Sequence, residues 1–265
     1  METATNVIEV ILNRSPFYIV TVFLICILLG MFAVSKKILD RRGAIGASII
    51  GGVIAITADF VWLILLILFL ALNHFVTITK YSYKEQMGLA EGKRGMRSLD
   101  NVLANGLIPS VIAFSAVYLE EGVAPVLYLT AICAVSADTF ASEIGVLSNK
   151  VYLITTFKKV KPGVDGGVSG LGEMSSMVGS VICAFFGFFM IGHLSSYFSS
   201  SFLSFPLTPL YLFLPFAAGV LSCQLDSILG ATLQRWGYLS NSGVNFLSVI
   251  TTTMGVWALF VFDIV

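Results

Sequence analysis

The chain has few charged residues, and this scarcity excludes an ordinary soluble domain. Only 11% of its 265 residues are Asp, Glu, Lys or Arg, whereas soluble domains average about 25%. Its hydrophobic fraction is 57% and its mean hydropathy is +0.93, both typical of a polytopic membrane protein. The 15 basic residues balance the 15 acidic ones. A net charge of zero gives no indication of a nucleic-acid partner.

Cysteine and histidine are also scarce. None of the four cysteines has a CxxC or His-paired spacing, and each lies in an apolar run, so we interpret them as small buried hydrophobic residues. The two histidines, His74 and His193, are predicted at opposite membrane faces, which excludes a shared metal site. The longest polar loop, about residues 77–100, is too short for a soluble domain. Residues 1–265 are therefore predicted to form a single integral membrane domain.

Apolar segments of the length needed to cross a bilayer recur along the chain. About 20 helical residues cross a hydrocarbon core of roughly 30 Å. The second and third segments are short and nearly continuous, so they form either a hairpin turning at Asp59 or one span with a re-entrant piece. Lys36 and Lys37 follow the first segment, which favours a span over a cleaved signal peptide. The eight predicted spans are 17–34, 43–58, 60–76, 101–118, 124–148, 168–194, 207–229 and 243–263.

Basic residues are confined to alternate loops, with Arg14 as the exception. Loops rich in Lys and Arg stay in the cytosol, so the fold class predicted is an all-α transmembrane bundle of about eight spans with both termini outside. Seven spans would break the alternation. We expect the plasma membrane as the location, with a polar site that faces the cytosol. A short amphipathic helix is predicted around Tyr83–Glu91, and residues 195–206 are predicted to form an outer loop.

Two motifs place polar side chains near the predicted cytosolic face. Asn101 and Asn105 lie one turn apart on one helical face, with Arg97 a further turn back. Amides and a cation near a helix N-terminus suit a phosphate, although helix capping and an interhelical hydrogen bond would also explain them. Asp138 and Glu143 are five residues apart in the fifth span, about 140° around an ideal helix. Such acids are costly in a membrane and suit Mg²⁺, or else a buried polar network.

A glycine-rich segment, residues 161–172, precedes the sixth span. It contains Lys161, Gly163, Gly166, Gly167 and Ser169, and it is predicted to be a flexible cytosolic loop. Glycines let backbone N–H groups approach an anion, so the segment could bind phosphates together with nearby lysines. It has no Walker A pattern, and a plain turn is the alternative interpretation. Glu173, one turn into the helix, is a further candidate ligand.

The seventh and eighth spans contribute a similar set of acidic and amide side chains. Asp226 lies near the predicted cytosolic end of the seventh span, and Asn241 and Asn245 open the eighth helix one turn apart. Acids, amides, a glycine-rich loop and bases on one side match the needs of phosphoryl transfer, in which metal ions and donors neutralise phosphate charge. Polar residues do not continue across the bilayer, which argues against an ion or proton transporter with a site near the midplane.

Taken in order, these motifs resemble a family of integral membrane proteins that includes the phytyl-phosphate kinase of plant vitamin E biosynthesis and animal transmembrane protein 19. The resemblance runs from about Arg42 to Phe246. The departure is Ser242, where the family tends to have Asp; the loss of that carboxylate puts a metal role for the segment in doubt. The motifs that carry the resemblance are VLANG (102–106), ADT with ASE (137–143), PG with GGVS (162–169) and DS with GATLQ (226–234).

The resemblance implies an isoprenyl-monophosphate kinase that uses a nucleoside triphosphate, CTP before ATP, and Mg²⁺. Asp138, Glu143 and Asp226 would hold the metal, and Arg97 with Lys158, Lys159 or Lys161 would stabilise the transferred group. The alternatives are a cytidylyltransferase that makes a CDP-lipid, a lipid or metabolite transporter, and a structural membrane protein. The sequence leaves a homo-oligomer open. The phosphate ligands implied are Asn101, Asn105, Asn241, Asn245 and the loop Gly163–Ser169, with Gly166 and Gly167.

Overall fold

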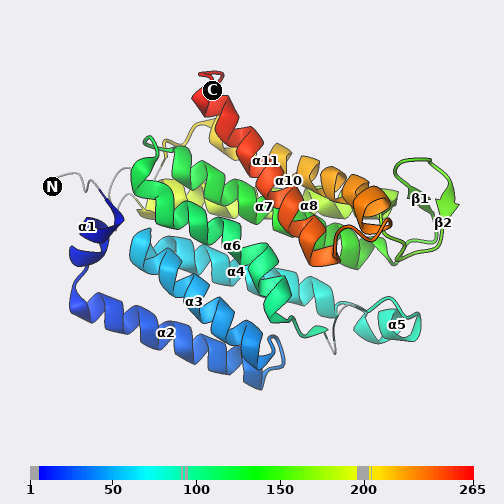
Figure 1. The fold of residues 1–265 in the computed structure, drawn as a ribbon, viewed down its shortest axis with the longest axis horizontal. Helices are drawn as coiled ribbons and strands as arrows, with labels where there is room; N and C mark the ends of the chain where they lie inside the picture. The colour runs from blue at the N-terminus through cyan, green and yellow to red at the C-terminus, as the bar shows by residue number, and fades with distance from the viewer. Residues whose placement is uncertain (1–5, 91, 93–94, 196–202, 204) are drawn as a thin grey trace.

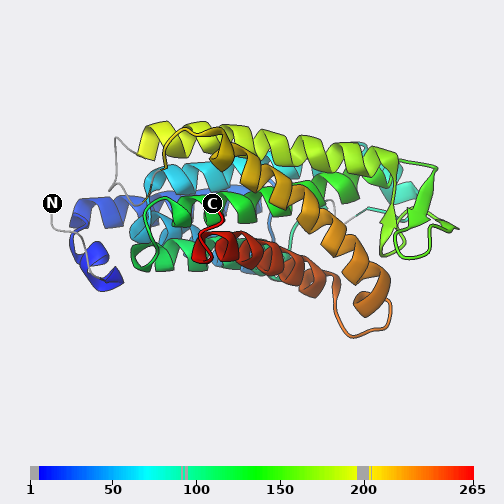
Figure 2. The same ribbon diagram turned by 90° about the horizontal axis from the view of Figure 1, so that it is seen from above.

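Long helices run back and forth along one axis of the molecule, as Figure 1 and Figure 2 show. The structure is a computed structural model that describes residues 6–90, 92, 95–195, 203 and 205–265. Within these residues each predicted span coincides with one long helix, to within a few residues at its ends. The long helices are α2 (Pro16–Ser35), α3 (Arg41–Thr57), α4 (Phe60–Ile78), α6 (Leu99–Ser115), α7 (Val123–Gly145), α8 (Gly170–Phe189), α10 (Pro209–Leu229) and α11 (Asn241–Val261).

Short elements extend or connect the long helices. A 3-10 turn, η2 (Ala116–Tyr118), follows α6, while the π-helical turns η3 (Met190–Ser195) and η5 (Gly230–Gln234) extend α8 and α10. Helices α1 (Val7–Leu12) and α5 (Tyr81–Gln86) are short. The helix predicted around Tyr83–Glu91 is therefore confirmed in a shorter form. Glu91 itself, like most of the predicted outer loop 195–206, lies outside the described residues.

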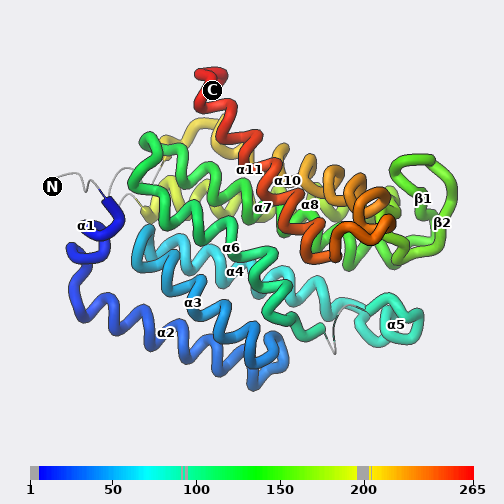
Figure 3. Tube along the Cα trace, in the orientation of Figure 1, coloured from blue at the N-terminus to red at the C-terminus, as the bar shows by residue number. Residues whose placement is uncertain are grey.

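The helices confirm a polytopic membrane fold. Seven of the described helical segments are long and apolar enough to cross a bilayer. Helix α3 has 17 residues and falls just short, but it lies between α2 and α4 and runs beside them (Figure 3). The crossing by α3 and the outside location of both termini remain predictions.

The break between α3 and α4 lies where the sequence predicts a hairpin turn. Helix α3 ends at Thr57, and the buried carboxylate of Asp59 caps α4 by accepting from the backbone N–H of Val61 at 3.1 Å. The guanidinium of Arg14 donates to the carbonyls of Ile56 and Ala58. Arg14, the one basic residue outside the alternate loops, therefore caps the C-terminal end of α3.

Helix α7 forms the centre of the bundle. In its most apolar stretch of 18 residues, 94% of the residues are buried. The helix packs against α4, α6, α8, α10 and α11. Its C-terminal end meets the start of α8 through two glycines: a Cβ added to Gly145 would lie 3.0 Å from the Cα of Gly172. This close approach places the N-terminus of α8 beside the polar residues of α7.

A small antiparallel sheet precedes α8, and the sequence analysis did not predict it. It consists of β1 (Val151–Leu153), β2 (Lys159–Val160) and β3 (Gly167–Val168) in the order β2-β1-β3. Of the segment 161–172, predicted as a flexible loop, residues 167–168 are therefore a strand, and residues 170–172 begin α8. Val151 pairs with Val160, and Tyr152 pairs with Val168. Val151 and Leu153 are buried while Tyr152 is exposed, the alternation expected of a strand with one covered face. Strands of two or three residues carry too little periodicity to be recognised in a sequence.

A buried ion pair fastens the connection between α4 and α6 to α7. Lys84, on α5, is fully buried, and its Nζ lies 2.5 Å from Glu143 Oε2 on α7 and 2.7 Å from the carbonyl oxygen of Thr77. Lys84 lies in the loop 77–100, and Glu143 was predicted as a metal ligand. The ion pair holds α5 against the end of the bundle.

The topology predicts which added cysteines react from which side. The four native cysteines are buried, so single cysteines at exposed positions can be labelled selectively with a membrane-impermeant maleimide. If α3 and α4 both cross, Lys36→Cys and Tyr83→Cys label from the same side, and Glu121→Cys labels from the other. Labelling of Lys36→Cys and Tyr83→Cys from opposite sides would show that α3 does not cross.

The ion pair predicts a double-mutant result. Because removal of one partner leaves a buried charge uncompensated, Lys84→Met or Glu143→Leu alone should cost about 3–5 kcal/mol of stability. The double variant Lys84→Met/Glu143→Leu should recover most of that loss, since two apolar residues replace the charges. Thermal unfolding of the detergent-purified protein measures this. Losses that simply add in the double variant would contradict a direct pair.

Candidate functional site

A polar cavity of about 310 Å³ lies where α7, α10 and α11 meet the N-terminus of α8. The segment between β2 and β3 forms part of its wall, through Gly163, Val164, Asp165 and Gly166. Most of the sequence-predicted site residues line the cavity, although they come from five separate parts of the chain. They are Arg97, Asn101, Asp138, Glu143, Gly163, Gly166, Gly167, Ser169, Glu173, Asp226, Asn241 and Asn245.

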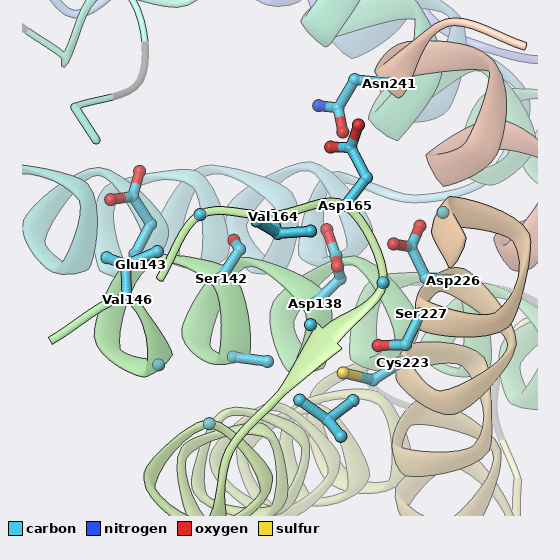
Figure 4. A pocket seen from close by; sticks show the side chains of 18 of the residues that line it. Asp138, Ser142, Glu143, Val146, Val164, Asp165, Cys223, Asp226, Ser227 and Asn241 are labelled. Carbon is cyan, nitrogen blue, oxygen red and sulfur yellow. The ribbon is translucent and has the colours of Figure 1, made fainter. Parts of the chain in front are cut away.

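Several carboxylates line this cavity, among them Asp138 on α7, Asp165 on the segment before β3 and Asp226 on α10. Figure 4 shows the side chain of Asp165 extending toward Asn241, on the other side of the segment from Asp138. Glu143 stands apart from the three, and its Oε2 contacts Lys84. The structure thus brings Asp138 and Asp226 together as predicted, but it does not bring Glu143 to them. The 140° separation on the helix explains why Asp138 and Glu143 diverge.

Asn245 lies between two of these carboxylates. In one orientation its amide nitrogen is 3.4 Å from Asp138 Oδ2. Turned by 180°, the nitrogen instead donates to Asp226 Oδ2 at 3.3 Å and to the carbonyl oxygen of Asn241 at 2.9 Å. The turned orientation satisfies both the nitrogen and the oxygen of the amide. Asn245 thus links α11 to the acids of α7 and α10.

The donor set fits a magnesium ion bound partly through water and phosphate. Among the described residues, no group of three or more His, Cys, Asp or Glu is arranged to hold a metal by itself. Mg²⁺ usually takes one or two carboxylates, several waters and substrate phosphates rather than a closed protein cage. Asp138 and Asp226 supply such a pair. Asp165, which is exposed, also lines the cavity.

Hydrogen bonds hold the acids of α8 and α10 in place. Ser248 on α11 donates to Asp226 Oδ2 at 3.3 Å, and Gln224 donates to Glu173 Oε2 at 2.5 Å. Glu173 lies in the first turn of α8, as predicted, and it lines the cavity with its carboxylate already bonded.

The N-terminus of α8 opens onto the cavity. Ser169 caps the helix: its Oγ accepts from the backbone N–H of Gly172 at 3.1 Å and lies 3.4 Å from the carbonyl oxygen of Gly145. The hydroxyl of Ser169 is therefore already engaged in capping the helix. The partial positive charge at this helix end favours an anion beside the acids.

The glycines before α8 have a packing role that the sequence did not reveal. Gly166 has φ +73°, and a Cβ there would overlap with Ala231 in the π-helical turn η5. Gly166 therefore lets the segment press against η5, which brings the neighbouring Asp165 to the cavity. An additional role for these glycines in phosphate binding stays a prediction.

The predicted bases and amides divide into two groups. Arg97 and Asn101 line the cavity, whereas Asn105 and Lys161 do not. Asn101 Oδ1 accepts from the backbone N–H and the hydroxyl of Ser98, so the capping interpretation is observed and only its amide nitrogen can donate to a ligand. Lys161 is exposed, as are Lys158 and Lys159 on the sheet. Arg97 is fixed by a 3.3 Å contact with Thr77 Oγ1.

Sequence reasoning missed Asp165 and Ser248. Asp165 stands within the glycine-rich motif, and an acid directly before Gly166 and Gly167 was the available signal. Ser248 lies one turn beyond Asn245 on the same helical face, so the periodicity that picked out Asn241 and Asn245 extends to it.

Comparison with known proteins places these residues in a family. The sequence matches the family described as integral membrane protein DUF92 over residues 24–253. An uncharacterized membrane protein of Methanocaldococcus jannaschii is 34% identical over 87% of this chain and 89% of its own length. Protein PGR of Arabidopsis thaliana is 28% identical over 91% of this chain and 96% of its own length.

A further relative is Protein VTE6, chloroplastic, of Arabidopsis thaliana, which is 30% identical over 65% of this chain and 50% of its own length. No solved structure matches the chain. The resemblance predicted from the motifs is confirmed, and the family match spans the helices that carry every predicted site residue. The chain therefore belongs to the integral membrane protein family DUF92.

Proposed function

We propose that the protein transfers a phosphoryl group from a nucleoside triphosphate, CTP before ATP, to an isoprenyl monophosphate. The observation that carries this proposal is the pair Asp138 and Asp226 held around Asn245 beside the N-terminus of α8. Carboxylates that attract a cation, next to a helix end that attracts an anion, suit a metal–phosphate complex. The surrounding bundle consists of membrane-spanning helices, as a lipid substrate requires.

The substrate class comes from a relative. VTE6 is the phytyl-phosphate kinase of vitamin E biosynthesis, and it is 30% identical to 65% of this chain. The names of the archaeal relative and of PGR state no activity. The prenyl chain and CTP are therefore proposals drawn from this one relative and from the polar cavity.

We assign the residues roles according to their positions. Asp138 and Asp226 would hold Mg²⁺, which neutralises phosphate charge when bound. The α8 N-terminus and the backbone of residues 163–169 would bind the nucleotide phosphates, with Asn241 at the opposite wall. Arg97 and the amide nitrogen of Asn101 would bind the acceptor phosphate. Because Lys161 is exposed outside the cavity, we assign stabilisation of the transferred group to Arg97.

Transfer at this site needs no strong general base. An oxygen of the ionised acceptor monophosphate forms the new bond to the γ-phosphorus, the bond from that phosphorus to the β–γ bridging oxygen breaks, and the nucleoside diphosphate leaves. Catalysis then consists of positioning and charge neutralisation. The roughly 310 Å³ cavity is at the lower end of the range for small-molecule sites, about 300–1,000 Å³. It suits phosphate groups whose nucleoside and chain extend outside.

The basic loops favour a cavity that faces the cytosol. The sheet carries exposed Lys158 and Lys159 at the same end of the bundle as α5 (Figure 1). We therefore propose a cytosolic opening, with the plasma membrane as the expected location of this integral membrane protein.

A product assay tests the reaction. Purified protein given Mg²⁺, CTP and geranylgeranyl or phytyl monophosphate should yield the prenyl diphosphate and CDP, with ATP a weaker donor. Chromatography with phosphorus detection identifies both products. Pyrophosphate and a CDP-lipid would instead establish a cytidylyltransferase. Prenyl-phosphate binding without any product would indicate a carrier.

Acid-to-amide variants test the assigned roles. Asp138→Asn and Asp226→Asn should each lower kcat about 100-fold or more, the scale seen when a charge-stabilising group is removed from an active site, and should raise the Mg²⁺ concentration needed for half-maximal rate. Asp263→Asn, an exposed acid beyond α11, is the matched control and should be unchanged. The Lys84→Met/Glu143→Leu variant should keep activity, because Glu143 is assigned to the ion pair. If that double variant folds but loses activity, Glu143 is a ligand of the metal after all.

A further inference from the structure

A second, narrow crevice lies between α3, α4 and α6. Its volume is about 40 Å³. Its walls are largely apolar, with Ile50 from α3, Leu66 and Phe69 from α4, and Val102 from α6. A crevice of this volume has room for a few carbons of one hydrocarbon chain but not for a headgroup or a ring system.

The crevice adjoins the polar cavity. Arg97 and Asn101 line both spaces, so the cation and the amide assigned to the acceptor phosphate lie between them. From Asn101 the crevice follows α6 inward to Gly106, a rise of about 7.5 Å at 1.5 Å per residue. A polar end and an apolar end in this order match the form of a lipid phosphate monoester.

The side chain of Asn105 also lines the crevice. Its half-buried side chain faces the crevice rather than the cavity, and it makes no hydrogen bond to another residue in the part of the chain that the structure describes. Because this amide is only half-buried, it remains accessible to a ligand in the crevice. A phosphate ester seated at Arg97 would present oxygen acceptors close to this amide.

We propose that this crevice binds the first carbons of a single-chain lipid phosphate monoester, and that Ala47, Ile50 and Gly106 determine which chains enter. This inference rests on the proposed function, since it places the acceptor of that reaction. Lipid tails are as apolar as the crevice walls, so the crevice gains little hydrophobic affinity over the bilayer. It acts by aligning the chain so that the phosphate reaches Arg97. Two-chain phosphatidates are excluded by its small volume.

Photo-crosslinking locates the chain directly. A geranylgeranyl monophosphate analogue with a diazirine on its first isoprene unit, added without nucleotide, should label peptides of α3, α4 and α6 around Ile50, Phe69 and Val102. Excess unlabelled geranylgeranyl monophosphate should abolish this labelling, whereas a diacyl phosphatidate should not. Labelling confined to the outer faces of α2 or α11 would overturn the inference, as would competition by the phosphatidate.

A paired substitution tests the same crevice by function. Ala47→Phe fills the crevice, whereas Ile49→Phe adds similar bulk on the lipid-facing side of the same helix, where Ile49 is 63% exposed. Ala47→Phe should weaken binding of geranylgeranyl monophosphate at least tenfold, while Ile49→Phe should leave it within twofold and binding of the nucleotide should be unchanged in both. Equal effects of the two variants would overturn the crevice as the chain site.

The two proposals can fail separately. Crosslinks in the crevice without phosphoryl transfer would retain the chain site and remove the kinase. Phosphoryl transfer by Ala47→Phe at the full rate with geranylgeranyl monophosphate would retain the kinase and remove the chain site. Thermal unfolding of Ala47→Phe, compared with Ile49→Phe, establishes that the variant is folded.

Discussion

The cost of holding carboxylates at the end of an apolar bundle governs this structure. Asp138 and Glu143 are both on α7, the most buried helix, and each is stabilised in a different way. Glu143 contacts the buried ammonium of Lys84, while Asp138 and Asp226 share the amide of Asn245. In the proposed reaction, Mg²⁺ would neutralise these two carboxylates. The Lys84–Glu143 ion pair stabilises the fold, whereas Asp138 and Asp226 line a cavity that has room for a ligand.

Close packing by small residues puts the parts of the site within reach of one another. Gly145 and Gly172 let α8 start against α7, and Gly166 lets the segment before β3 contact η5. The π-helical turn of η5 widens the end of α10 at Gly230, and π-helical turns of this kind often occur at functional sites. The glycine-rich motif is thus explained first by backbone packing, and that packing delivers Asp165 to the cavity.

Much of the fold follows from the sequence, because membrane spans carry a strong signal of length and hydropathy. All eight predicted segments became helices, and Asp59 capped α4 where the hairpin was predicted to turn. The sheet of residues 151–168 and the buried state of Lys84 escaped prediction, since both depend on contacts between segments far apart in the chain. In the site, Asp138 and Asp226 were predicted as acids within apolar spans, and Asn245 was predicted from its helical spacing with Asn241. Asp165 was not, because its approach depends on the fit of Gly166 against Ala231. Asn105 had the right spacing but lines only the crevice, whereas Asn101 lines the cavity as well.

A structure with Mn²⁺ in place of Mg²⁺ and a non-hydrolysable CTP analogue tests the central claim most directly. The account predicts a metal ion, located by its anomalous scattering, in contact with Asp138 and Asp226, and nucleotide phosphates at the N-terminus of α8. Asn245 should then take one fixed orientation. Nucleotide and metal bound elsewhere, with the cavity holding only water between the same side chains, would contradict it.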